Sequence, residues 1–60
     1  MKVITTRAIG NIPTGSQGVR QQVDGDRWRV KITHKAPACE VFEYSLGFLP
    51  KNYFEPGGNC

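Results

Sequence analysis

The chain has 60 residues and a formal net charge of +3 at pH 7. A chain of this length forms one domain with a thin core, because it buries only about 60% of the surface that its unfolded form exposes. Hydrophobic residues make up 38% of the sequence and charged residues 22%, which is typical of a globular protein and excludes a low-complexity chain.

The N-terminal residues and the charge guide the expected location and partners. Residues 1–7 hold no apolar segment of signal-peptide length, and no run approaches the roughly 18 apolar residues of a membrane span. We therefore expect a cytoplasmic protein without a membrane-spanning segment, in which Cys39 and Cys60 are free thiols. The mildly basic surface favours an acidic partner or nucleic acid.

The spacing of turn residues indicates short strands. Glycine and proline interrupt the chain about every ten residues, and no window has helical periodicity, which is typical of strands joined by turns. The β-branched residues within Lys2–Ala8 predict the first strand, and residues 10–16 have the composition of a loop.

A hairpin is predicted in the middle of the chain. The next two strands alternate apolar and polar side chains on both sides of Asp24-Gly25, a two-residue hairpin signal. The register that this turn sets places Gln21 opposite Trp28 and Val19 opposite Val30. One face of the hairpin is then apolar around Trp28. The other face carries four basic side chains: Arg20, Arg27, Arg29 and Lys31.

A loop and a fourth strand follow the hairpin. His34–Ala38 contains a proline, which cannot donate to a central ladder, so this segment is predicted as a loop. Cys39–Leu46 is predicted as the fourth strand, and its alternation directs one set of side chains toward the core: Phe42, Tyr44 and Leu46.

The last segment completes the predicted fold. A short 3₁₀ turn is predicted over Pro50–Tyr53, because proline presets φ for a first helical position, and Phe54–Glu55 then forms a last strand. The pattern predicts an all-β fold with about five strands that curl into one small barrel and so remove exposed sheet edges. This domain covers residues 1–56, and residues 57–60 form a flexible tail.

Two segments resemble a known family. Residues 47–55, Gly-Phe-Leu-Pro-Lys-Asn-Tyr-Phe-Glu, resemble the end of SH3 domains, and Trp28 at the head of a strand is a second similarity. Residues 13–19, Pro-Thr-Gly-Ser-Gln-Gly-Val, are similar to a turn in the shorter SH3-like barrels that serve as accessory subunits of bacterial and photosynthetic complexes. The acidic loop of SH3 domains is absent. The resemblance implies an SH3-like barrel with a peptide groove lined by Pro50, Asn52 and Tyr53.

Two sets of side chains are candidates for binding a partner. Aromatic residues that a thin core cannot hold form a docking surface with their neighbours: Phe48, Pro50, Asn52 and Tyr53. The basic side chains of the hairpin suit carboxylates or phosphates: Arg20, Arg27, Arg29 and Lys31. The first set also fits an ordinary core, and the second set also fits a solvated strand face.

The leading prediction is a non-catalytic protein-binding module. Such a module is an accessory subunit of a larger assembly, or a small inhibitor from a phage or other mobile element. It docks on a larger protein with an acidic patch, toward which the arginines steer it. The alternative is a basic nucleic-acid-binding barrel that uses the arginine face.

No pattern for catalysis or for a cofactor is present. The single histidine, His34, has no serine and aspartate partners at a recognisable spacing, and Glu40 and Glu43 lie on opposite faces of their predicted strand. The two cysteines lack the spacing of a metal site. Residues 15–18 are rich in glycine but precede a strand, whereas a phosphate cradle needs a helix N-terminus. We therefore expect no enzyme activity, no metal and no cofactor.

Overall fold

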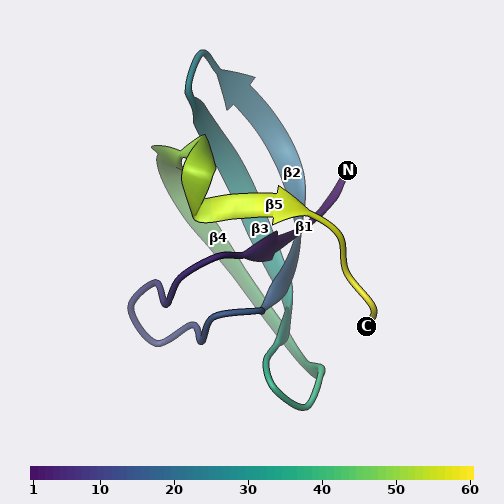
Figure 1. The fold of residues 1–60 in the computed structure, drawn as a ribbon. Coiled ribbons are helices and arrows are strands. Elements are labelled where there is room, and N and C mark those ends of the chain that lie inside the picture. The colour runs from purple at the N-terminus through teal and green to yellow at the C-terminus, as the bar shows by residue number, and fades with distance from the viewer.

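The computed structural model describes residues 1–60 as five antiparallel strands and one 3₁₀ turn (Figure 1). The strands form one sheet in the order β4-β3-β2-β1-β5. The elements are β1 (Lys2–Thr5), β2 (Gln17–Asp24), β3 (Arg27–Lys35), β4 (Glu40–Pro50), the 3₁₀ turn η1 (Lys51–Tyr53) and β5 (Phe54–Pro56). The predicted all-β class, the 3₁₀ turn and the last strand are confirmed. No helix of the structure has the length and hydropathy needed to cross a membrane.

The sheet curls so that distant strands cover one core. Figure 1 shows β5 crossing in front of β2 and β3, and the ring of Trp28 in β3 stacks on Phe54 in β5 with centroids 6.4 Å apart. β4 and β5 are the two edges of the sheet, and no ladder joins them. The core holds six buried hydrophobic residues: Val3, Ile12, Val30, Ile32, Leu46 and Phe54.

The β2–β3 hairpin has a different register from the predicted one. Asp24 pairs with Arg27, so the two turn residues are Gly25 and Asp26, and Gly25 has the positive φ of 59° that favours glycine at the first turn position. Further along, Gln21 is an extra residue in β2 that has no partner in β3. This β-bulge reverses the alternation of side chains in the rest of β2.

The bulge makes the predicted positions of two side chains wrong. Arg20, and not Val19, pairs with Val30, so Arg20 lies on the core side of the sheet. Val19 pairs with Lys31 on the outer side and is 38% exposed, although it was predicted to be in the core. An extra residue in one strand moves every side chain beyond it to the other face, which explains both errors.

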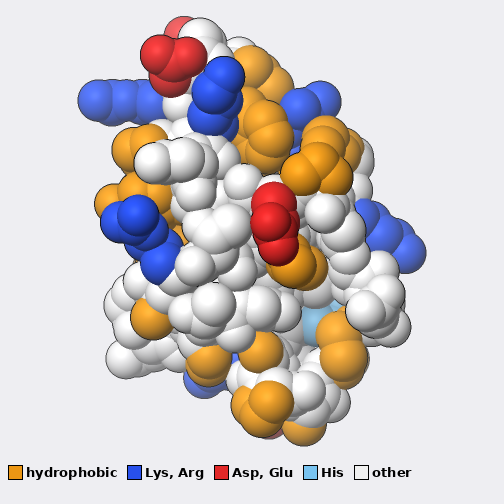
Figure 2. All heavy atoms as spheres, viewed as in Figure 1, with side chains coloured by type: hydrophobic (Ala, Val, Ile, Leu, Met, Phe, Trp, Pro, Cys, Tyr) orange, Lys and Arg blue, Asp and Glu red, His pale blue; other side chains and the backbone are white.

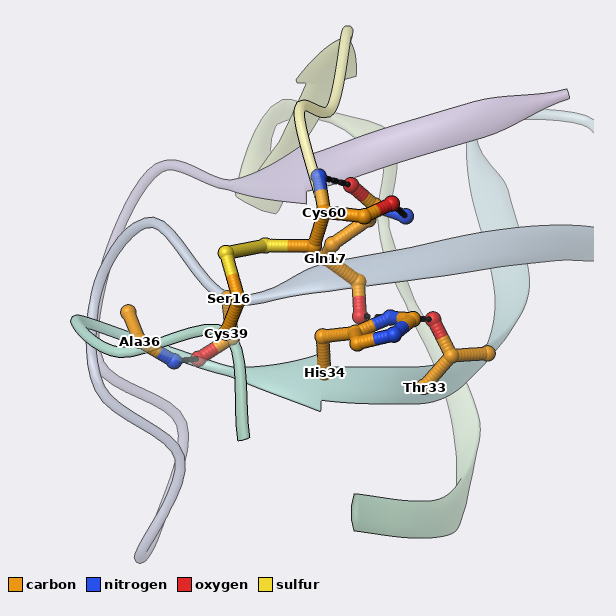
Figure 3. Close-up of a disulfide and its surroundings, with 7 residues drawn as sticks. All are labelled: Ser16, Gln17, Thr33, His34, Ala36, Cys39 and Cys60. Atoms are coloured by element: carbon orange, nitrogen blue, oxygen red, sulfur yellow. Dashed lines mark hydrogen bonds between the residues drawn. A yellow bond between two sulfur atoms is a disulfide. The ribbon is translucent and has the colours of Figure 1, made fainter. Parts of the chain in front are cut away.

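The tail is attached to the domain, contrary to the expectation of a flexible segment with free thiols. Cys39 and Cys60 form a disulfide with their Cα atoms 5.5 Å apart (Figure 3). The Cys60 N–H donates to Gln17 Oε1 at 2.8 Å, and Gln17 Nε2 donates to the Cys60 carbonyl at 3.3 Å. The Gly57 N–H also donates to the Lys2 carbonyl at 3.1 Å. Cross-linking residues 21 apart stabilises a domain by about 3 kcal/mol in the chain-entropy model, which suits a chain with so small a core.

Gly18 allows β2 to approach β3 closely. A Cβ atom at this position would lie 2.6 Å from the Lys31 carbonyl oxygen and 2.9 Å from Val30 Cγ1. Because the first of these atoms belongs to the backbone of the neighbouring strand, any larger side chain would push the two strands apart.

We expect Gly18→Ala to lower the free energy of unfolding by about 1–3 kcal/mol, since overpacking a tight contact has this cost. The matched control is Gly47→Ala, because no atom lies within 4 Å of a Cβ at Gly47, and we expect a change of about 0.5 kcal/mol or less. Urea unfolding followed by Trp28 fluorescence measures both variants. Equal losses in the two variants would contradict the close approach.

Candidate functional site

Five of the predicted site residues lie together on the outer face of β3 and β4. Residues that pair directly in antiparallel strands point to the same side of the sheet. Arg27 pairs with Pro50 and Arg29 pairs with Phe48, while the alternate residue Val30 points into the core. We call this surface the basic face, and its members are Arg27, Arg29, Lys31, Phe48 and Pro50.

Arg29 and Phe48 form the centre of the basic face. The guanidinium carbon of Arg29 lies 6.0 Å from the centroid of the Phe48 ring, and Arg29 Nη1 donates to Gln22 Oε1 at 3.4 Å. The Phe48 side chain is 36% exposed. A cation over an aromatic ring is favourable even in solvent, so the pair presents an apolar surface and a charged group side by side.

A bulge in β4 puts Phe48 on the outside. Leu46 and Gly47 together lie opposite the single residue Val30, so the alternation in β4 is reversed at this point. Leu46 is buried and Leu49 packs against the core, whereas Phe48 between them points outward. The exposed aromatic side chain is therefore a consequence of the backbone, because both leucines already fill the inner side.

Arg20 does not belong to the basic face, contrary to the prediction. It lies on the core side because of the Gln21 bulge, and its guanidinium carbon is 4.9 Å from the Trp28 ring centroid. The half-buried Trp28 ring thus stacks on Phe54 and also contacts the Arg20 guanidinium. Figure 2 shows hydrophobic side chains over the upper end of the hairpin with Lys and Arg side chains beside them.

The 3₁₀ turn directs its two predicted site residues toward the start of the β1–β2 loop. The Arg7 guanidinium carbon lies 4.4 Å from the Tyr53 ring centroid, and the half-buried Tyr53 packs against the core. The Thr6 hydroxyl donates to the Asn52 carbonyl at 2.8 Å, and the Thr6 N–H donates to the Tyr53 carbonyl at 2.7 Å. Arg7 therefore covers one face of the Tyr53 ring, a residue that the SH3 resemblance places in a peptide groove.

Sequence reasoning missed how regularly cations cover aromatic rings. Four such pairs occur in this chain, the fourth being Lys35 Nζ at 4.9 Å from the Phe42 centroid. The two members of each pair lie at least seven residues apart in the sequence, so no local pattern predicts these contacts.

The prediction that Phe42, Tyr44 and Leu46 face the core holds for Leu46, which is buried, and for Phe42, which packs against the core, but not for Tyr44. Leu46 is buried and Phe42 is half-buried, but Tyr44 is 53% exposed even though it pairs with the buried Ile32. The residues between β1 and β2 do not cover this end of β4, so the tyrosine lies at the margin of an open hollow.

No cluster of three or more His, Cys, Asp or Glu side chains is placed to hold a metal ion. The single histidine, His34, has Nδ1 2.9 Å from the Thr33 hydroxyl and forms no ion pair with a carboxylate.

No protein-family model, curated protein or solved structure matches this chain. Its function is therefore inferred from the chemistry of its surface.

We expect Arg20→Ala to expose the Trp28 ring, because the guanidinium covers the ring in the folded chain. The variant should show a red-shifted tryptophan emission, stronger quenching by iodide and a loss of about 0.5–1 kcal/mol in the free energy of unfolding. Arg27→Ala removes an equal charge from the basic face and should leave the emission unchanged. An unchanged spectrum in Arg20→Ala would place Arg20 on the outer side of the sheet.

Proposed function

We propose that this chain is a non-catalytic binding module that docks through the basic face onto a larger protein with an acidic patch. The observation that carries the proposal is the exposed Phe48 ring beneath the Arg29 guanidinium. Aromatic and arginine side chains are the groups that most often dominate binding energy in protein interfaces. The ring supplies apolar contact area, and the guanidinium offers a planar fork to carboxylates.

The charges of the basic face support an acidic partner. Arg27 and Arg29 form no salt bridge within the chain, so their charges are available to a partner. Lys31 is 3.8 Å from Glu43, an exposed pair that contributes little to stability. Complementary charge of this kind raises the rate of encounter and selects the partner, while the aromatic contact supplies affinity.

The finer architecture is part of the proposal. We assign the curled five-stranded sheet to the SH3-like barrels, and the 3₁₀ turn before the last strand supports this assignment. The resemblance then suggests an accessory subunit of a larger assembly or a small inhibitor from a phage or other mobile element. Because Arg7 lies over Tyr53, the proposed docking surface is the basic face and not the surface that corresponds to the proline-peptide groove of SH3 domains.

A second candidate is binding of single-stranded nucleic acid. Base stacking on an aromatic side chain next to arginine is the usual chemistry of such proteins, and Phe48 and Arg29 share one face. Asp24 lies opposite Arg27 in the β2–β3 ladder, and Glu43 in β4 is 3.8 Å from Lys31, so carboxylates interrupt a continuous basic track for a phosphate backbone. The protein partner is favoured for this reason.

Affinity capture with the intact chain, followed by titration of the captured protein, tests the proposal. Phe48→Ala and Arg29→Glu should each weaken binding by about tenfold or more, a loss of about 1.4 kcal/mol. Val23→Thr is the matched control, because Val23 is exposed on the other side of the sheet.

Two outcomes would contradict the protein partner. Full binding by both variants would remove the basic face from the interface. Binding of an oligodeoxythymidine probe that falls steeply and log-linearly with salt, with loss in Arg29→Glu, would establish the nucleic-acid alternative.

The location is also proposed. Disulfides persist in oxidising environments and are rare in the cytosol, so the Cys39–Cys60 bond favours an oxidising compartment over the cytoplasm expected from the sequence. Alkylation of thiols in intact producing cells should leave both cysteines unmodified. Alkylation of both cysteines in all copies of the protein would support the cytoplasmic location instead.

A further inference from the structure

A second surface lies on the inner side of β4, facing away from the basic face. It is an open hollow of about 330 Å³ between the β1–β2 loop and β4. Its walls are Ile9–Ile12 on the loop side and three alternate residues on the strand side: Phe42, Tyr44 and Leu46. We call it the β4 groove. None of the predicted site residues lines it.

The loop wall of the β4 groove is already formed in the free chain. Ile9 and Ile12 exchange two backbone hydrogen bonds of 2.9 Å, and the Ile12 side chain is anchored in the core. The base of the loop is held by Thr5, whose buried hydroxyl donates to the Pro13 carbonyl at 3.1 Å and accepts from the Ser16 N–H at 3.2 Å. A preformed wall reduces the entropy lost when a ligand binds.

The strand wall offers two kinds of contact. The Phe42 and Tyr44 rings stack with centroids 6.3 Å apart and an interplanar angle of 24°, which gives the groove a continuous apolar side. β4 is also an edge of the sheet, and no backbone hydrogen bond outside the β3 ladder involves it. Free N–H and C=O groups on an edge strand are a template for an extended peptide.

The charge at the groove is positive. Lys35 Nζ lies over the Phe42 ring and forms no salt bridge, and no acidic residue lines the groove. Glu43, the carboxylate next in sequence to Phe42, is held by Lys31. Glu40 lies opposite Lys35 in the β3–β4 ladder but forms no salt bridge with it, so a ligand at the Lys35 end of the groove meets an ammonium group that no carboxylate of the chain binds directly.

We propose that the β4 groove binds an extended, acidic peptide segment of a protein partner. One large apolar side chain of the peptide enters the hollow, a carboxylate pairs with Lys35, and a few backbone groups pair with the free edge of β4. The volume is at the lower limit of small-molecule sites but suits one or two side chains. A second copy of this chain is disfavoured because each copy carries a net charge of +3.

Selection from a random peptide library displayed on phage, with the intact oxidised chain as target, tests this proposal. The enriched peptides should combine a large apolar residue with a neighbouring Asp or Glu. In an NMR titration of the wild-type chain, they should shift the amide signals of Ile9–Ile12 and of residues 42–46. Absence of enrichment, or shifts confined to the basic face, would overturn the proposal.

Variants separate the groove from the basic face. Tyr44→Ser should weaken the binding of the selected peptides by about tenfold. Lys35→Glu should also weaken their binding, and it should favour versions of the peptides in which Lys replaces the acidic residue. Val41→Ser is the matched control on β4, since Val41 is 76% exposed and lies outside the groove. Equal binding by wild-type and Tyr44→Ser chains would exclude the groove.

Arg29→Glu distinguishes this proposal from the proposed function. This variant should leave peptide affinity in the groove within about twofold of wild type, while it weakens the binding of the captured protein to the basic face. Concentration-dependent dimerisation that is lost in Tyr44→Ser would assign the groove to a second copy and would overturn the acidic peptide.

Discussion

The surface of this protein depends on where its strands insert an extra residue. Side chains in a strand alternate with a period of two, so one additional residue moves all that follow to the other face. Gln21 in β2 places Arg20 on the Trp28 side, and the pair Leu46-Gly47 in β4 places Phe48 outside. The positions of Arg20 and Phe48 follow from these two insertions.

The placement of Arg20 shows how a thin core tolerates the extra residues in β2 and β4. A charged group on the inner side of a sheet is costly unless it keeps contact with water or a favourable partner. The guanidinium of Arg20 lies on the Trp28 ring near the end of the hairpin, where the long side chain remains partly solvated. Six buried hydrophobic residues cannot enclose every aromatic ring, and cations cover several of those that remain accessible.

Patterns within single segments of the sequence predicted the strands. Features that depend on contacts between distant segments were not predicted. The alternation around Trp28, the hairpin glycine and Pro50 predicted the strands and the 3₁₀ segment, because each acts on its immediate neighbours. The two-residue turn lies one position later than predicted, at Gly25-Asp26. The bulge at Gln21 depends on pairing with another strand, so the predicted core position of Val19 was wrong. Cys60 bonds with Cys39, 21 residues away in the sequence, and is hydrogen-bonded to Gln17, 43 residues away. No local pattern contains that contact.

The same limit applied to the candidate sites. Arg27, Arg29 and Lys31 were correctly grouped, because β3 alternates regularly between them, but Phe48 joined them only through the β4 bulge. The β4 groove was not predicted, since its two walls come from a loop and a strand that are distant in sequence. Each wall by itself has the apolar composition expected of residues that pack in a core.

The size of the chain constrains how any partner must bind. A stable interface buries about 800 Å² on each side, roughly a fifth of the 3790 Å² accessible surface of this protein. One strand face with five side chains is too small to supply that area. A partner that docks on Phe48 and Arg29 therefore has to extend over an edge of the sheet, and β4 is the edge next to the basic face. Continuing around β4 brings the partner to Tyr44 and the unpaired Lys35, where the charge has the same sign. A single acidic partner wrapped around β4 would contact both surfaces and bury more area than a partner on either surface alone.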